Sequence, residues 1–282
     1  MSDSTFAIGG ELNVNRMGFG AMRITGDGVW GWPIDRAYAK SLLQRVVELG
    51  VQLIDTADAY GPEVSEYLIA EALHPYAEDV VIATKGGLTR GGPGNWERDG
   101  RPEHLRRALE NSLRRLQVEQ IDLYQLHAVD DNVPLADQVG MLRDLQNQGK
   151  IRHIGLSNVS VEQLDEAMEI APIVSVQNRY NLTYRAHQAV LDRCQALGIG
   201  FIPWYPLAAS ALTETGESTL MEIASQYEAS VGQIALAWLL QTSPVMLPIP
   251  GTSSIAHLEQ NTAAADITLS SESLDILNNL SS

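Results

Sequence analysis

Four side chains that could carry out one reaction together stand near the ends of apolar segments of the chain. They are a carboxylate, a phenol, an ammonium and an imidazole, at Asp55, Tyr60, Lys85 and His127. A tyrosine with a pKa of about 10 is a poor acid at neutral pH unless a positive charge stabilises its phenolate. A lysine within hydrogen-bond distance would do this, and a carboxylate behind the lysine would keep the lysine charged. The four types therefore predict a proton donor whose pKa a neighbouring lysine lowers.

Reduction of a carbonyl group is the chemistry that suits such a donor best. A phenol can give its proton to an oxygen that becomes an alkoxide while a hydride reaches the carbon, and a histidine can orient that oxygen. Hydrolysis and phosphoryl transfer fit less well. The sequence has no apparent activated Ser or Cys, no metal-ligand spacing and no Gly-Lys-Ser/Thr motif. Nor is Gly18-Phe-Gly20 a dinucleotide fingerprint, because the third glycine is missing.

The elements that would position these side chains alternate between strand-like and helical patterns. After a hairpin at 5–16, apolar segments predict eight strands, at 16–22, 52–58, 80–86, 121–129, 153–159, 173–178, 200–206 and 245–251. Helical segments fall at 36–50, 64–73, 101–116, 134–148, 160–170, 187–197, 219–227, 230–241, 254–264 and 270–280. This order predicts an α/β fold, a single (β/α)8 TIM barrel over residues 1–282 with an N-terminal β-hairpin. The C-terminal ends of its strands would bring the four side chains to one face.

Composition and charge exclude several classes of function. The formal net charge is −16, from 19 basic and 35 acidic residues, which argues against binding to nucleic acid or to an anionic membrane surface. No apolar stretch approaches the roughly 18–20 residues of a membrane span, and the N-terminus lacks the pattern of a secretory signal. We therefore expect a cytoplasmic protein whose partner is a small molecule, with no obligate protein partner.

The chain resembles the aldo-keto reductase family along essentially its whole length. Asp55 and Tyr60 stand in the segment DTADAYG, Lys85 in IATKG and His127 in YQLHAV, and GKIRHIGLSNV at 149–159 is similar to a further signature. The resemblance implies a (β/α)8 barrel with NADPH extended across its top. It also implies that Tyr60 is the general acid, that Lys85 and Asp55 tune it, and that His127 orients the carbonyl.

The resemblance further implies where the cofactor would lie. The expected contacts, from the nicotinamide to the 2′-phosphate end, are Ser157, Asn158, Gln177, Trp204, Tyr205, Pro206, Leu207, Gly251, Thr252, Ser253, His257, Gln260 and Asn261. The first three would hold the carboxamide of the nicotinamide, and Trp204 would stack on the nicotinamide ring. Backbone groups at 205–207 would approach the pyrophosphate. Many family members carry Lys or Arg where this chain has Gly251 and His257. NADPH is therefore expected with fewer positive charges around its 2′-phosphate, and NADH is the less favoured alternative.

The substrate pocket is less well defined by the sequence. The irregular stretch 86–100 is expected to form a long loop over the barrel mouth. Its Trp96, with Trp30 and Trp32 after the first strand, could line the pocket or plug the barrel rim. The expected substrate is a small aldehyde or ketone, with aromatic aldehydes or pyridoxal as candidates. The alternative is a regulatory or binding subunit with the same barrel and nucleotide but slow turnover; the intact set of four residues favours the enzyme.

Overall fold

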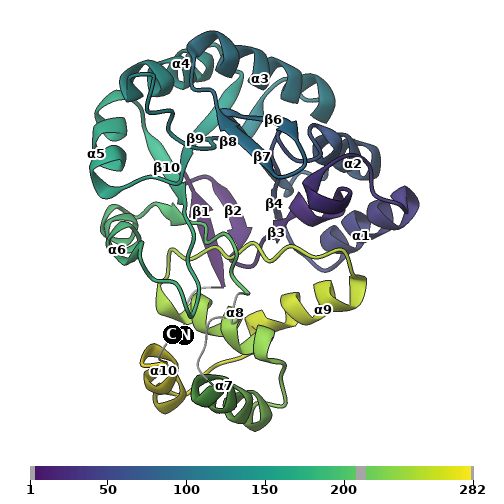
Figure 1. Cartoon of the computed structure of the whole chain (residues 1–282), viewed down its shortest axis with the longest axis vertical. Helices are drawn as coiled ribbons and strands as arrows, with labels where there is room; N and C mark the ends of the chain where they lie inside the picture. Colours follow the sequence, from purple (N-terminus) through teal and green to yellow (C-terminus); the bar gives the residue numbers. More distant parts are fainter. Residues whose placement is uncertain (1–3, 208–213, 281–282) are drawn as a thin grey trace.

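A parallel sheet forms the centre of the computed structural model, which describes residues 4–207 and 214–280. Its strand order is β11-β10-β9-β8-β5-β4-β3. The strands are β3 (Phe19–Gly20), β4 (Leu53–Asp55), β5 (Val81–Gly86), β8 (Ile121–Leu126), β9 (Ile151–Ser157), β10 (Ile173–Gln177) and β11 (Gly200–Phe201). Neighbouring strands pair in parallel, and the helices that connect them lie on the outside of the ring (Figure 1). The architecture is the predicted (β/α)8 barrel.

The eighth predicted strand, at 245–251, closes the ring with few hydrogen bonds. Phe201 pairs with Met246 in an isolated parallel bridge. On the other side, Gly18 N donates to Pro248 O at 2.9 Å. The two prolines of this segment have no N–H to contribute to a ladder. The segment therefore completes the barrel without forming a regular strand.

Helices match the predicted segments closely. They are α1 (Arg36–Glu48), α2 (Val64–Leu73), α3 (Pro102–Leu116), α4 (Leu135–Asn147), α5 (Val161–Ile170), α6 (Gln188–Leu197), α7 (Glu214–Gln226), α8 (Val231–Thr242), α9 (Ile255–Ala263) and α10 (Ser271–Asn278), with 3-10 turns η1 (Ala21–Ile24), η2 (Asp27–Val29) and η3 (Ala264–Asp266). Asp35 caps α1 by accepting a hydrogen bond from Tyr38 N at 2.8 Å. Only α7 begins well before its predicted start.

The bottom of the barrel is closed by the antiparallel hairpin of β1 (Thr5–Ile8) and β2 (Leu12–Asn15). Ile8 and Val14 are fully buried and pack with Leu53 and Leu123 in an apolar cluster inside the barrel. This end of the barrel is therefore filled by side chains, and the open end is the one at the C-termini of the strands.

The segment 86–100 is a second hairpin rather than the expected irregular loop. Its strands are β6 (Leu88–Gly92) and β7 (Asn95–Arg98), which pair antiparallel. The prediction was wrong because it treated the glycines of this stretch as loop residues. Pro93-Gly94 instead makes the turn between two strands, and Gly94 has a φ of +73° that few other residues adopt.

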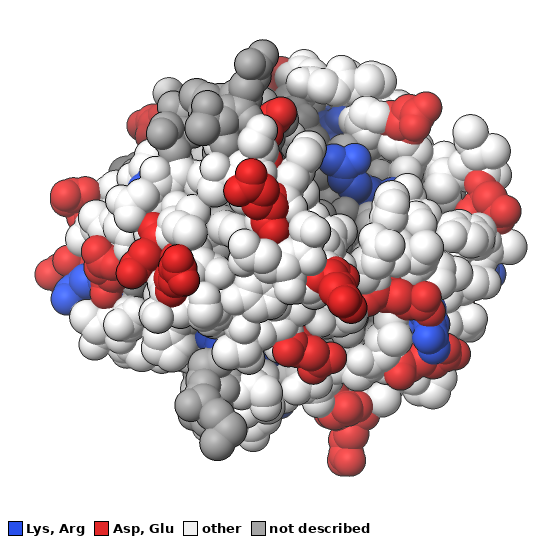
Figure 2. Space-filling model, turned by 90° about the horizontal axis from the view of Figure 1, so that it is seen from below, with Lys and Arg blue, Asp and Glu red and all other residues white. Residues whose placement is uncertain are grey.

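The surface carries the negative charge that the composition requires. Acidic side chains outnumber basic ones on the face seen from below (Figure 2), in keeping with the net charge of −16. Among the described helices, none combines the length and apolar character needed to cross a membrane.

Candidate active site

The predicted carboxylate, ammonium and phenol meet at the C-terminal end of the sheet. Asp55 ends β4, and Lys85 lies near the end of the neighbouring β5. Lys85 Nζ donates to Asp55 Oδ2 at 2.6 Å and lies 3.4 Å from the Tyr60 hydroxyl. The exposed fractions are 0 % for Lys85, 1 % for Asp55 and 7 % for Tyr60. Two residues distant along the chain, Tyr60 and Lys85, are thus in direct contact in a nearly dry environment.

Burial and charge act in opposite directions on the pKa of Tyr60. Burial raises this pKa and Lys85 lowers it, and burial has the larger effect, so the pKa lies above its usual value of about 10. Lys85 thus lowers the pKa of the phenol as predicted, but desolvation of the phenolate, which the sequence does not reveal, outweighs this one nearby ammonium. The result still suits a proton donor, since the phenol is protonated at neutral pH.

Lys85 stays charged although it is completely buried. Burial works against the positive charge, but Asp55 and Tyr60 together outweigh it and raise the pKa of Lys85. A third hydrogen bond, from Lys85 Nζ to Thr56 O at 2.8 Å, satisfies another of its protons. The ammonium is therefore fixed in position behind the phenol.

His127 follows β8 and lies beside Tyr60, with the two ring centroids 5.8 Å apart and the planes at 80°. Burial lowers the pKa of His127 well below its usual value, and Lys85 lowers it further. The imidazole is therefore neutral at neutral pH. Its buried Nδ1 has no hydrogen-bond partner among the described residues. A neutral ring so placed can offer a hydrogen bond to an oxygen next to the phenol.

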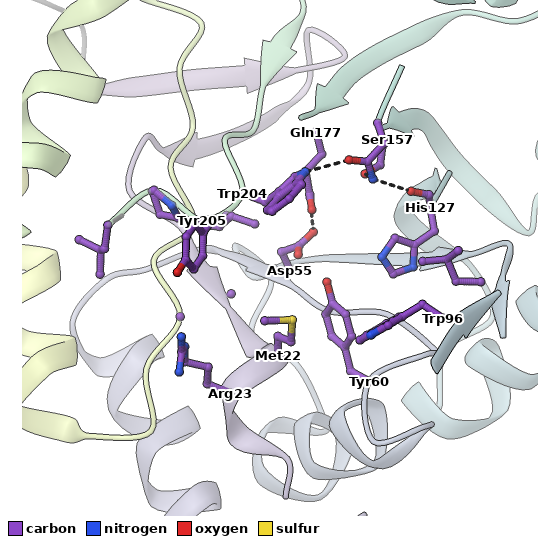
Figure 3. Close-up of a pocket in the computed structure, with 17 residues that line it drawn as sticks. Met22, Arg23, Asp55, Tyr60, Trp96, His127, Ser157, Gln177, Trp204 and Tyr205 are labelled. Carbon is purple, nitrogen blue, oxygen red and sulfur yellow. Dashed lines mark hydrogen bonds between the residues drawn. The ribbon is translucent and has the colours of Figure 1, made fainter. Parts of the chain in front are cut away.

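Two amide side chains hold the second oxygen of Asp55. Gln125 Nε2 donates to Asp55 Oδ1 at 3.1 Å. Gln177 Nε2 donates to the same atom at 2.8 Å, as Figure 3 shows. Gln125 was missed by the sequence analysis. Its signal was a polar residue inside an apolar strand, since a buried amide needs partners. Gln177, predicted to hold a nicotinamide carboxamide, contacts the Asp55 carboxylate in the structure.

Asn158 connects the backbone carbonyl of His127 with the indole of Trp204. Its Nδ2 donates to His127 O at 3.0 Å, and its Oδ1 accepts from Trp204 Nε1 at 3.0 Å (Figure 3). The same Nδ2 lies 3.0 Å from Ser157 Oγ. The backbone φ of Asn158 is +58°, a left-handed conformation that asparagine adopts more readily than most residues. The predicted residues Ser157, Asn158 and Trp204 are therefore adjacent.

A cavity of about 700 Å³ opens above these groups (Figure 3). It is lined by Gly20, Met22, Arg23, Asp55, Tyr60, Leu88, Trp96, His127, Ser157, Asn158, Gln177, Trp204, Tyr205, Pro206, Leu207, Ile249 and Gly251. Arg23 is the only lysine or arginine among these described residues, and the sequence analysis did not single it out. The predicted cofactor contacts from Ser157 to Leu207, and Gly251, therefore surround one space with Asp55, Tyr60 and His127.

The remaining predicted cofactor contacts lie outside this lining, and they are Thr252, Ser253, His257, Gln260 and Asn261. The start of α9, where a 2′-phosphate was expected, is already hydrogen-bonded. Ser254 N donates to Thr252 Oγ1 at 3.0 Å, and Ile255 N donates to Tyr38 Oη at 3.1 Å. A phosphate bound to these amides would have to replace both hydroxyls.

The three predicted pocket tryptophans have different surroundings. Trp96 lines the cavity and lies edge-on to Tyr60, with the ring centroids 6.4 Å apart. Trp30 and Trp32 are not among the lining residues. Trp32 is 44 % exposed and stacks with the Arg36 guanidinium, whose carbon lies 4.0 Å from the ring centroid. Of the three, only Trp96 is placed to contact a substrate.

Comparisons with known proteins agree with this geometry. Residues 16–282 match the sequence model of a family described as "Aldo/keto reductase family". The chain is 43% identical over 287 residues to pyridoxine 4-dehydrogenase of Escherichia coli, covering 100% of this chain and 99% of that protein. It is 53% identical over 263 residues to an uncharacterised oxidoreductase of Schizosaccharomyces pombe, covering 93% and 85%. An aldo-keto reductase from Klebsiella pneumoniae, solved in complex with NADPH, superposes with a TM-score of 0.83 at 30% identity, covering 99% and 95%.

Proposed function

Because the chain belongs to the aldo/keto reductase family and is an NAD(P)-dependent oxidoreductase, we propose that it reduces small aldehydes and ketones to alcohols with NADPH. The observation that carries this proposal is the buried contact of 3.4 Å between Tyr60 and a lysine that Asp55 holds at 2.6 Å. It places a protonated phenol beside a fixed positive charge, which is what the oxygen of a carbonyl needs as it gains electrons.

Each of the four residues has a definite task in this reaction. The nicotinamide, when bound, supplies the hydride to the carbonyl carbon. Tyr60 donates its proton to the carbonyl oxygen, and Lys85 stabilises the phenolate that remains. His127, neutral because burial lowers its pKa, donates a hydrogen bond to the same oxygen and so orients it. Asp55 holds Lys85 in place.

The cavity can accommodate an anionic dinucleotide in spite of the negative surface. Its lining joins the carboxamide contacts predicted at Ser157 and Gln177 to Arg23 and Gly251. Gly20 and Gly251 approach closely, since a side chain on Gly251 would meet Gly20 O at 2.7 Å. Arg23, three residues after Gly20, lines the same cavity and is the only arginine or lysine of its described lining, so we assign the phosphates of the dinucleotide to it. Thr252, Ser253, His257, Gln260 and Asn261 remain proposed contacts of the adenosine end.

The walls of the cavity near Tyr60 favour a flat substrate. Trp96, His127 and Tyr60 present three aromatic rings, and Leu88 and Met22 add apolar surface. Aromatic aldehydes pack well against such walls. The likeness to pyridoxine 4-dehydrogenase, at 43% identity, makes pyridoxal the first compound to test.

The proposal is tested by NADPH oxidation, followed by absorbance with benzaldehyde and pyridoxal, for the wild type and for Tyr60→Phe. The wild type should consume NADPH, and Tyr60→Phe should lose about 100-fold or more in kcat, the scale of a positioned proton donor. Phe fills the same volume, so a fold defect is not expected. If both proteins consume NADPH at the same rate, Tyr60 is not the proton donor. If neither protein consumes NADPH with benzaldehyde or with pyridoxal, the proposed activity is wrong.

A further inference from the structure

We infer that Arg90 makes the substrate pocket selective for flat aromatic carbonyl compounds, because it holds the indole of Trp96 as a fixed wall beside Tyr60. Arg90 lies on β6, is half-buried, and does not itself line the cavity. Its role is to position Trp96, and the selectivity rests on the proposed carbonyl reduction at the same site.

The guanidinium of Arg90 joins three segments of the chain. Its nitrogens donate to the backbone carbonyls of Gly28 at 3.2 Å, Val29 at 3.0 Å, Ala59 at 3.1 Å and Asn95 at 3.0 Å. Four hydrogen bonds from a rigid, planar group leave it little freedom to move. Arg90 thereby fixes the β6–β7 hairpin against η2 and against the residue that precedes Tyr60.

Trp96 stacks on this fixed guanidinium. The Arg90 Cζ lies 3.7 Å from the centroid of the Trp96 ring, a cation–π arrangement. Trp96 is 38 % exposed and lies on the β6–β7 hairpin, residues 88–98. Burial alone would therefore not hold its ring in one orientation. Arg90 supplies the missing constraint.

The held indole completes a narrow aromatic site. Trp96 stands at 80° to Tyr60 and at 72° to His127, with its centroid 6.4 Å and 6.5 Å from theirs (Figure 3). A flat ring can lie against the indole with its carbonyl between the phenol and the imidazole. A saturated ring of the same carbon count is thicker and gains no stacking, so we expect a discrimination of about fivefold.

The test compares benzaldehyde with cyclohexanecarboxaldehyde, which differ in flatness but not in carbon count. The ratio of their kcat/KM values is measured for the wild type, Arg90→Met, Trp96→Ala and the double variant, with Arg107→Met as a control. Arg107 is exposed on α3 and does not line the cavity. A disturbance of Tyr60 would lower both rates together and leave their ratio unchanged, so the ratio reports on the wall alone.

We expect a ratio above one in the wild type and in Arg107→Met, and a loss of about fivefold in Arg90→Met. The double variant should match Trp96→Ala, since Arg90 acts through the indole. An unchanged ratio in Arg90→Met, or a further loss in the double variant, would overturn the inference.

Two measurements without turnover separate this inference from the proposed activity. Calorimetric titration of both aldehydes in the presence of NADP⁺ gives the same discrimination as a ratio of dissociation constants. Acrylamide quenching of tryptophan fluorescence should increase in Arg90→Met but not when Trp96→Phe is also present. If the wild type reduces neither aldehyde, these two measurements still test the role of Arg90. That role would be rejected if wild type and Arg90→Met had the same ratio of dissociation constants and the same acrylamide quenching.

Discussion

At the scale of single residues, the environment of Tyr60 shows how burial can outweigh the effect of a neighbouring charge on a pKa. The sequence predicts that Lys85 approaches the phenol, and the structure places the two 3.4 Å apart. It does not predict that burial of the ring raises the pKa of Tyr60 by more than Lys85 lowers it. The extent of desolvation depends on every neighbouring side chain, and no local pattern reports it.

The raised pKa of Tyr60 predicts different pH dependences for the two directions of the reaction. Carbonyl reduction needs the phenol, which predominates below its pKa, so kcat/KM for an aldehyde should be flat from about pH 6 to 9. Alcohol oxidation needs the phenolate, so its rate should rise about tenfold per pH unit over the same range. Lys85→Met removes the group that lowers the pKa of Tyr60, so its rate of alcohol oxidation should fall below that of the wild type. A wild-type reduction rate that falls between pH 6 and 9, with the fall absent in Tyr60→Phe, would contradict this assignment.

Arg23 predicts a measurable electrostatic contribution to cofactor affinity. Arg23→Gln removes the single arginine of the described cavity lining, and hydrogen bonds to charged groups contribute about 1.5–3 kcal/mol. The dissociation constant for NADP⁺ should therefore rise at least about tenfold in a fluorescence titration, and the difference should shrink in 0.5 M salt as screening increases. Arg107→Gln is the matched control, because Arg107 is exposed on α3 and does not line the cavity. Equal constants for Arg23→Gln and wild type would remove Arg23 from the site.

The same titration tests the preference between the two dinucleotides. The amides at the start of α9 are engaged by Thr252 and Tyr38, so a 2′-phosphate gains less there than at unoccupied amides. We still expect a lower dissociation constant for NADPH than for NADH, because phosphate oxygens can replace both hydroxyls as acceptors. Tyr38→Phe frees one amide and should strengthen NADPH binding without changing NADH binding. A lower constant for NADH in the wild type would refute the preference.

At the scale of elements, the spacing of apolar residues predicted nearly every helix, while the length of a strand also depends on contacts with distant segments. The pattern at 101–116 matches α3 to within one residue at its start, because an amphipathic helix repeats its apolar positions over many residues. The segment 16–22 forms only the short strand β3 before η1 begins. Its Gly20 lies so close to Ile249 O that a side chain would come within 2.7 Å. Such contacts between distant segments limit β3, and they cannot be read from either segment alone.

A buried ion pair joins α2, α3 and β5 behind the active site. Arg115 Nε donates to Glu66 Oε2 at 2.6 Å, and Thr84 Oγ1 donates to Glu66 Oε1 at 2.6 Å. The exposed fractions of Arg115 and Glu66 are 6 % and 0 %. Asp58 lies nearby, and burial, followed by the charge of Glu66, raises its pKa well above the usual value. Arg115 is therefore the cation that makes the burial of these acids tolerable.

Removing that cation should be costly, although an ion pair of this kind adds little over apolar packing. Arg115→Met leaves the Glu66 carboxylate buried without its partner, so the free energy of unfolding should fall by about 3–5 kcal/mol. Arg114→Met, on the same helix but exposed, should change it by less than about 1 kcal/mol. Urea denaturation of the three proteins measures both effects. A loss below 1 kcal/mol in Arg115→Met would mean that water reaches Glu66.

At the scale of the whole molecule, the two ends of the chain are tied into one barrel. Arg16, just before β3, donates to Ser243 O and Leu240 O at 2.8 Å each, and both carbonyls lie at the end of α8. Arg45 of α1 pairs with Glu259 of α9 at 2.8 Å. The prediction of one domain over residues 1–282 therefore implies that these distant segments unfold together.

That implication, combined with the cofactor site, gives a test on the whole protein. Thermal unfolding followed by circular dichroism and by tryptophan fluorescence should show one coincident transition. NADP⁺ at 100 times its dissociation constant should add about 2.7 kcal/mol of stability and raise Tm by several degrees as a single step. At the same concentration Arg23→Gln should show a smaller rise, because the ligand stabilises the barrel only as far as it binds. Two transitions, with only one of them moved by NADP⁺, would divide the chain into separate units and end the single-domain interpretation.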